Sequence, residues 1–85
     1  MSKQYIRVAA EFTKEGAVNP ILIWWGDKSY TVDRILDRRR AASLKAGGIG
    51  WRYTCRILGK ERYLFYDDEE QQWFVEVPDP YTVPF

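Results

Sequence analysis

The 85-residue sequence predicts an all-β fold, a small SH3-like or OB-like barrel of five to six antiparallel strands in a meander. Apolar and polar residues alternate with a period of two in several segments. Short connections such as Gly26-Asp27 and Gly59-Lys60 are typical of tight β-hairpins. The strand–helix–strand spacing of a parallel sheet does not recur. We expect one barrel domain over residues 1–77 and a proline-rich tail over residues 78–85.

The first strand is expected over residues 5–12. Arg7 and Glu11 fall on one face of this strand, and the other face is apolar: Ile6, Val8, Ala10 and Phe12.

The first hairpin is expected to turn at Gly26 and Asp27, between the segments ILIWW and KSYTV. Counting outward from this turn gives the pairs Trp25–Lys28, Ile23–Tyr30 and Ile21–Val32. The core face then carries Ile21, Ile23, Tyr30 and Val32. Leu22 and Trp24 fall on the opposite face and are a candidate protein interface, because Trp is enriched at binding hot spots.

Residues 33–45 admit two interpretations. A short helix would begin at Asp33 and end before Gly47, but the apolar positions make a poor helical stripe: Ile35, Leu36 and Leu44. A bent third strand would instead continue through about Arg39 and lead into a loop. We favour the bent strand.

The second hairpin joins WRYTCRIL to ERYLFY, with Gly59 and Lys60 as the expected turn. The predicted pairs are Leu58–Glu61, Arg56–Tyr63 and Thr54–Phe65. One face belongs to the core: Trp51, Tyr53, Cys55, Leu64 and Tyr66. The other face mixes arginines with aromatics: Arg52, Thr54, Arg56, Tyr63 and Phe65. The last strand is QWFVEV, after the acidic segment DDEEQ.

Charge is distributed unevenly along the chain. Residues 1–66 hold thirteen bases and six acids, a balance of +7, whereas residues 67–85 hold six acids and no base. Such asymmetry indicates either a basic binding surface or an acidic end that folds back on the basic part.

The residue types argue against an enzyme. Histidine is absent, so the usual general base near neutral pH is missing. Cys55 is expected to be a buried structural thiol. The acids at 67–70 lack the spacing of a calcium loop, and KAGGIG lacks the residues of a phosphate loop, so we expect no metal and no cofactor. A single cysteine and an N-terminus without an apolar leader suggest a cytoplasmic protein, and no apolar run is long enough to imply a membrane partner.

Two kinds of partner fit these features. Arginines beside aromatics are typical of single-stranded nucleic-acid platforms, and the candidate nucleic-acid-binding residues are Arg34, Arg38, Arg39, Arg40, Lys45, Arg52, Arg56, Tyr63 and Phe65. The alternative is a protein–protein adaptor or homodimer that uses Leu22 and Trp24, a sheet edge or the tail at 78–85.

Several segments also resemble a family of small uncharacterised bacterial proteins: YTVDRILD, AASLKAGG, RYTCRI and RYLFY followed by WFVEV. The resemblance extends from Tyr5 to about Val77. The family has no established activity, so the resemblance implies no catalytic or ligand-binding residue. The run Arg38-Arg39-Arg40 and the proline-rich tail depart from the family pattern.

Overall fold

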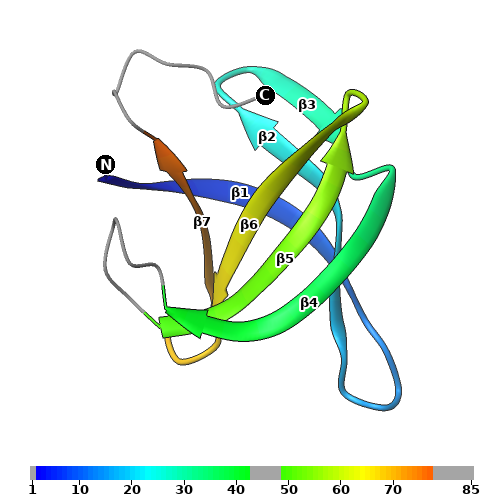
Figure 1. Ribbon diagram of the computed structural model, residues 1–85, viewed down its shortest axis with the longest axis vertical. Coiled ribbons are helices and arrows are strands. Elements are labelled where there is room, and N and C mark those ends of the chain that lie inside the picture. Colours follow the sequence, from blue (N-terminus) through cyan, green and yellow to red (C-terminus); the bar gives the residue numbers. More distant parts are fainter. Residues whose placement is uncertain (1, 43–48, 78–85) are drawn as a thin grey trace.

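The computed structural model describes residues 2–42 and 49–77, and these ranges contain seven β-strands and no helix. Lys45 and the tail at 78–85 lie outside the described residues. The predicted all-β class is confirmed. The strands, shown in Figure 1, are β1 (Ser2–Phe12), β2 (Val18–Trp25), β3 (Lys28–Thr31), β4 (Arg34–Ala42), β5 (Ile49–Ile57), β6 (Lys60–Asp67) and β7 (Gln72–Val77).

All seven strands belong to one sheet that curls into a half-barrel (Figure 1). Their order is β3-β2-β1-β7-β6-β5-β4, and every neighbouring pair is antiparallel. The two edges of the sheet are therefore β3 and β4, although these strands follow each other in the chain.

A two-residue link, Val32 and Asp33, joins β3 to β4. The antiparallel pairings give both strands the same direction, so they form one bent path that pairs first with β2 and then with β5. Residues 34–42 are extended, as the favoured interpretation expects, but they form a separate strand, β4, which ends at Ala42 instead of at about Arg39. The alternative of a helix is wrong for residues 34–42. The count is seven strands, not five to six, because the bend divides this path in two.

The first hairpin has the predicted turn and the predicted pairs Trp25–Lys28 and Ile23–Tyr30. Ile21 was expected in the core, but it is 50% exposed. It is an extra residue between the paired positions Pro20 and Leu22, and this bulge interrupts the alternation of β2. Phe12 was also expected on the apolar face but is 71% exposed, because it lies at the outer end of the β1–β2 hairpin.

The second hairpin turns at Leu58 and Gly59, both with positive φ (54° and 73°), instead of at Gly59 and Lys60. The observed pairs are therefore Arg56–Glu61, Thr54–Tyr63 and Arg52–Phe65. Moving a two-residue turn by one residue shifts each partner by two positions. Because side chains alternate with a period of two, both faces keep their predicted members.

The core lies inside the curl and consists of side chains from β2, β5, β6 and β7: Ile23, Tyr53, Cys55, Ile57, Leu64, Tyr66, Trp73, Val75 and Val77. The Trp73 ring lies 5.2 Å from the Tyr53 ring and 4.7 Å from the Tyr66 ring, between centroids. The Tyr53 hydroxyl donates a hydrogen bond across the interior to the carbonyl oxygen of Val18 on β2. Burial raises the pKa of Tyr53, so this hydroxyl keeps its proton.

Gly50 is required where β5 approaches β6. A Cβ atom at this position would lie 2.2 Å from the backbone oxygen of Tyr66. We expect Gly50→Ala to lower the free energy of unfolding by about 2–3 kcal/mol, because the two strands must separate to make room. Urea denaturation measures this loss. The control is Gly26→Asn, at an open turn position with a φ of 63° that Asn tolerates; equal denaturation midpoints for the two variants would contradict the expectation.

Tyr53→Phe tests the hydrogen bond across the interior. The variant leaves the Val18 carbonyl without its donor, and we expect the free energy of unfolding to fall by about 1–2 kcal/mol. Tyr63→Phe is the matched control, because Tyr63 is 51% exposed and its hydroxyl is accessible to water. A change under about 0.5 kcal/mol is expected for the control. If the two variants unfold at the same urea concentration, the bond does not stabilise the curl.

Candidate nucleic-acid interface

Four arginines and one tyrosine share the outer face of β4, β5 and β6, and we call this set the basic face: Arg34, Arg39, Arg52, Arg56 and Tyr63. Pairing places Arg34 directly opposite Arg56 and Arg39 directly opposite Arg52. Tyr63 lies opposite Thr54, between the two arginine pairs. Like charges directly opposite each other destabilise a sheet, so this face carries a positive charge density that works against folding.

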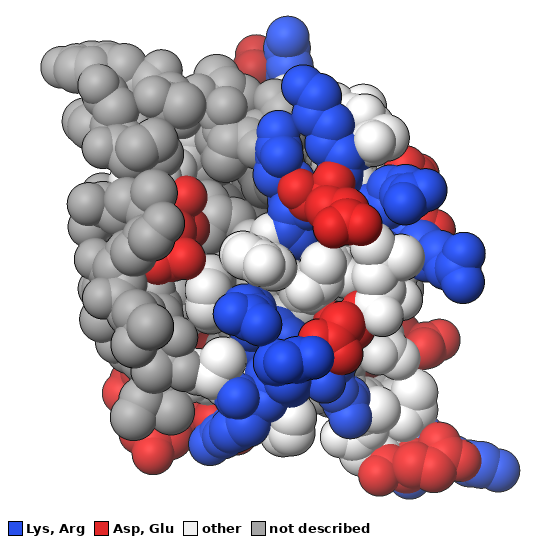
Figure 2. All heavy atoms as spheres, in the orientation of Figure 1, with Lys and Arg blue, Asp and Glu red and all other residues white. Residues whose placement is uncertain are grey.

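Acidic side chains offset only part of this charge. Asp37 binds Arg39 at 2.7 Å, between Oδ2 and Nε, and both side chains are exposed. Glu61 lies opposite Arg56 in the register. Among the described residues, ion pairs form at Arg39 and Arg40 but not at Arg34 or Arg56. Figure 2 shows Lys and Arg side chains gathered over β4 and the β5–β6 hairpin, with Asp and Glu side chains among them.

Tyr63 is the accessible ring of the basic face. The guanidinium carbon of Arg52 lies 4.7 Å from its ring centroid, within the range of a cation–π contact. The Arg52 Nε atom is buried and has no hydrogen-bond partner among the described residues. Arg52 is therefore held over Tyr63 with part of its hydrogen-bonding capacity unused.

Phe65 lies on the predicted face but is only 3% exposed, so its ring is not available to a ligand. It stacks on Phe74 of β7 at 5.1 Å between centroids, and Tyr5 of β1 packs edge-on against Phe74. Lys3 Nζ lies 4.9 Å from the Phe74 centroid. Sequence reasoning missed this row of rings, because it depends on the pairing of β1 with β7.

The three consecutive arginines separate onto the two faces of β4. One residue, Leu36, is bulged out of the pairing between Ile35 and Asp37. Beyond it, Arg39 shares the outer face with Arg52, whereas Arg38 and Arg40 lie opposite Tyr53 and Trp51. The predicted arginines therefore do not form one surface.

Arg40 contacts the acidic turn, as the folded-back interpretation of the charge pattern expects. Its Nη1 atom lies 2.7 Å from Asp68 Oδ2. This bond lowers the pKa of Asp68 below its usual range, although the group is exposed. Within residues 2–42 and 49–77, ion pairs thus neutralise Arg40 and, through Asp37, Arg39, whereas none forms at Arg34 or Arg56.

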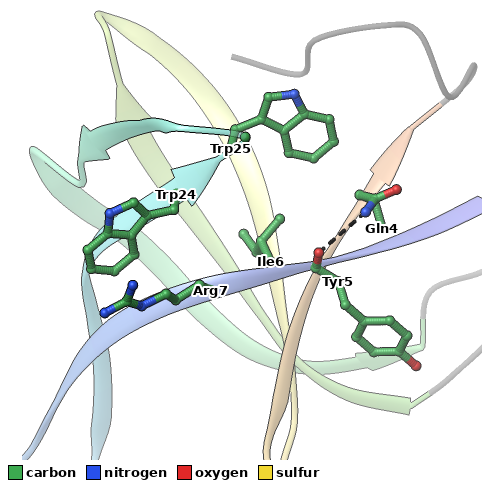
Figure 3. A pocket seen from close by; sticks show the side chains of 7 residues that line it. Gln4, Tyr5, Ile6, Arg7, Trp24 and Trp25 are labelled. Carbon is green, nitrogen blue, oxygen red and sulfur yellow. Dashed lines mark hydrogen bonds between the residues drawn. The ribbon is translucent and has the colours of Figure 1, made fainter.

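The two candidate interface residues, Leu22 and Trp24, lie on the outer face of β2 and are partly buried. The Arg7 guanidinium carbon lies 4.3 Å from the Trp24 ring centroid. Figure 3 shows Trp24 and Arg7 beside a pocket of about 290 Å³, which Trp25, Ile6 and Gln4 also line. The pocket opens where β1 leaves β2 at Arg7 and pairs with β7.

Cys55 is fully buried in the core. The described residues contain no group of three or more His, Cys, Asp or Glu side chains arranged to hold a metal ion. A helix of the length and apolarity needed to cross a membrane is likewise not found in this part of the chain.

Comparison of the chain with protein-family models, with curated proteins and with solved structures gave no match. The resemblance to a bacterial protein family therefore stays a prediction from the sequence segments that suggested it.

The Cys55 thiol should be unreactive in the folded protein. Burial raises its pKa to about 12, so almost no thiolate exists at pH 8. We expect Ellman's reagent to label the protein at pH 8 only after urea denaturation. Because the chain has one cysteine, the absorbance reports this site alone. Stoichiometric labelling of the native protein within minutes would contradict this burial.

Proposed function

We propose that this protein is a non-enzymatic binding domain whose basic face holds the phosphate backbone of single-stranded nucleic acid. The observation that carries the proposal is the pair of opposed arginine couples, Arg34–Arg56 and Arg39–Arg52. Guanidinium groups form paired hydrogen bonds with phosphate, and the release of counterions favours binding. An OB-like barrel, the finer fold expected from the sequence, binds oligonucleotides on its sheet face in the same manner.

Tyr63 is the reason for proposing single-stranded rather than double-stranded nucleic acid as the ligand. It lies between the two arginine pairs in the register and is half exposed. A base stacks on such a ring only when it is unpaired, and stacking of this kind tolerates any sequence. The basic face thus suits a flexible strand of mixed sequence.

The arginines of the basic face could instead serve to protect the edge of the sheet, but this explanation accounts for fewer of them than nucleic-acid binding does. Edge strands often carry charges and bulges that prevent pairing with other chains, and β4 is an edge with four arginines and a bulge. Arg52 and Arg56, however, lie on β5, which is paired on both sides. Edge protection does not require arginines at these interior positions.

Fluorescence anisotropy with labelled mixed-sequence DNA and RNA oligonucleotides tests the proposal. We expect association at 50 mM salt that weakens steeply by 200 mM. Arg34→Gln and Arg56→Gln should each weaken binding and reduce the slope of log affinity against log salt by about 1, whatever the sequence. Lys14→Gln, in the β1–β2 turn away from the basic face, removes the same charge and should leave the affinity unchanged. Absence of association at 50 mM salt would overturn the proposal.

The alternative function is an adaptor or homodimer that uses the outer face of β2. Partial exposure of Leu22 and Trp24 keeps this face accessible. Light scattering of the purified protein separates the two functions. A dimer that Trp24→Ala converts to a monomer, without oligonucleotide binding, would favour the adaptor.

A further inference from the structure

We infer that Arg40, with Arg38 and Trp51 beside it, is a second phosphate-binding site for the same ligand, which the Asp68 carboxylate occupies in the free protein. This inference rests on the proposed function and extends it to the rim of the half-barrel. Figure 1 shows the end of β4, the start of β5 and the β6–β7 turn close together at this rim.

At this site two guanidinium groups contact one aromatic ring. The guanidinium carbons of Arg38 and Arg40 lie 5.1 Å and 5.3 Å from the Trp51 ring centroid. Trp51 is partly buried and packs against the core, so it gives both arginines a fixed support. The Asp68 carboxylate accepts a hydrogen bond from Arg40, the interaction that a phosphate oxygen would make in its place.

The acidic turn presents Asp68 to Arg40 through its own hydrogen bonds. Asp67 Oδ1 accepts hydrogen bonds from the backbone amides of Glu69 and Glu70, at 3.0 Å and 3.2 Å. Asp67 thus holds the turn, while Asp68 reaches across to β4. The two neighbouring acids have different roles, and only Asp68 occupies the arginine.

A ligand on the basic face can reach this rim. Arg39 belongs to the basic face, and Arg40 follows it in the chain. Because β4 is an edge strand, no further strand covers its free side among the described residues, and a ligand can approach its side chains from there. The side chains of Arg40 and Asp68 are 51% and 38% exposed. Arg38 is also exposed. A strand of nucleic acid that crosses Arg39 and continues around the edge of β4 reaches Arg40.

The Asp68 contact is weak enough for a polyanion to displace. Exposed ion pairs change an equilibrium constant by a factor of about five at most. A ligand already held at several phosphates pays little additional entropy to bind one more group. Asp68 therefore competes with the ligand for Arg40. This competition lowers the affinity for nucleic acid and favours strands long enough to contact both the basic face and Arg40.

The test compares two variants that remove the same charge from the same turn. Asp68→Asn frees Arg40, whereas Glu70→Gln removes a carboxylate that forms no ion pair among the described residues. We expect anisotropy at 50 mM salt to show a rise in oligonucleotide affinity of about 3–5-fold for Asp68→Asn and a smaller rise for Glu70→Gln. Urea denaturation midpoints equal to the wild type show that both variants fold.

The double variant Arg40→Gln/Asp68→Asn identifies the cause. If Asp68 competes for Arg40, then Asp68→Asn has little effect on affinity in the Arg40→Gln background. Equal effects of Asp68→Asn and Glu70→Gln, or an undiminished effect in the Arg40→Gln background, would show a general charge effect and overturn the inference. The proposed function would stand in that case if Arg34→Gln and Arg56→Gln still weaken binding. Both fail if neither the wild type nor Asp68→Asn binds.

Discussion

The two backbone hydrogen bonds of the Val32–Asp33 link hold the sheet in its curl. Val32 donates to Ile21 on β2 at 2.8 Å, and Asp33 donates to Arg56 on β5 at 2.9 Å, so two residues join strands from opposite halves of the sheet. A flat seven-stranded sheet would leave the apolar faces of β2 and β5 exposed to water. The curl brings them together over one core, and the Tyr53–Val18 hydrogen bond crosses that core. The convex face that results displays Arg34 and Arg39 of β4 and Arg52 and Arg56 of β5.

For the β5–β6 hairpin the sequence was sufficient to predict which side chains share a face, because alternation and a two-residue turn set the parity of the two strands. It was not sufficient for register or bulges. The choice of Leu58 over Lys60 as a turn residue and the extra residue Ile21 depend on local backbone energies that composition does not display. The charge pattern allowed a contact between the basic part and the acidic end, but neither the Arg40–Asp68 pair nor the Phe65–Phe74 stack could be identified residue by residue. They join strands or turns distant in the chain, and only the assembled sheet brings them together.

The opposed arginines of β4 and β5 lower the stability of the fold while they provide the charge that the proposed binding requires. Arg34 opposite Arg56 and Arg39 opposite Arg52 each place two like charges across one pair of strands, an arrangement that costs stability. A small domain has little stability to lose, since its single core buries few side chains. Asp37 compensates Arg39 on the basic face, and Asp68 compensates Arg40 on the other face of β4. Among the described residues no ion pair forms at Arg34 or Arg56.

The single bulge at Leu36 decides which arginines face outward. Up to Ile35 the alternation of β4 points odd-numbered side chains inward, and after the extra residue it is reversed, so Asp37 and Arg39 point outward. If Leu36 were instead paired in regular alternation, Arg38 and Arg40 would point to the outer face. Asp37 and Arg39 would then point toward the apolar interior. The one extra residue at Leu36 thus decides which of the two arginine sets points outward, without altering the charge of the chain. The orientation of this surface is encoded in a residue count as much as in residue identity.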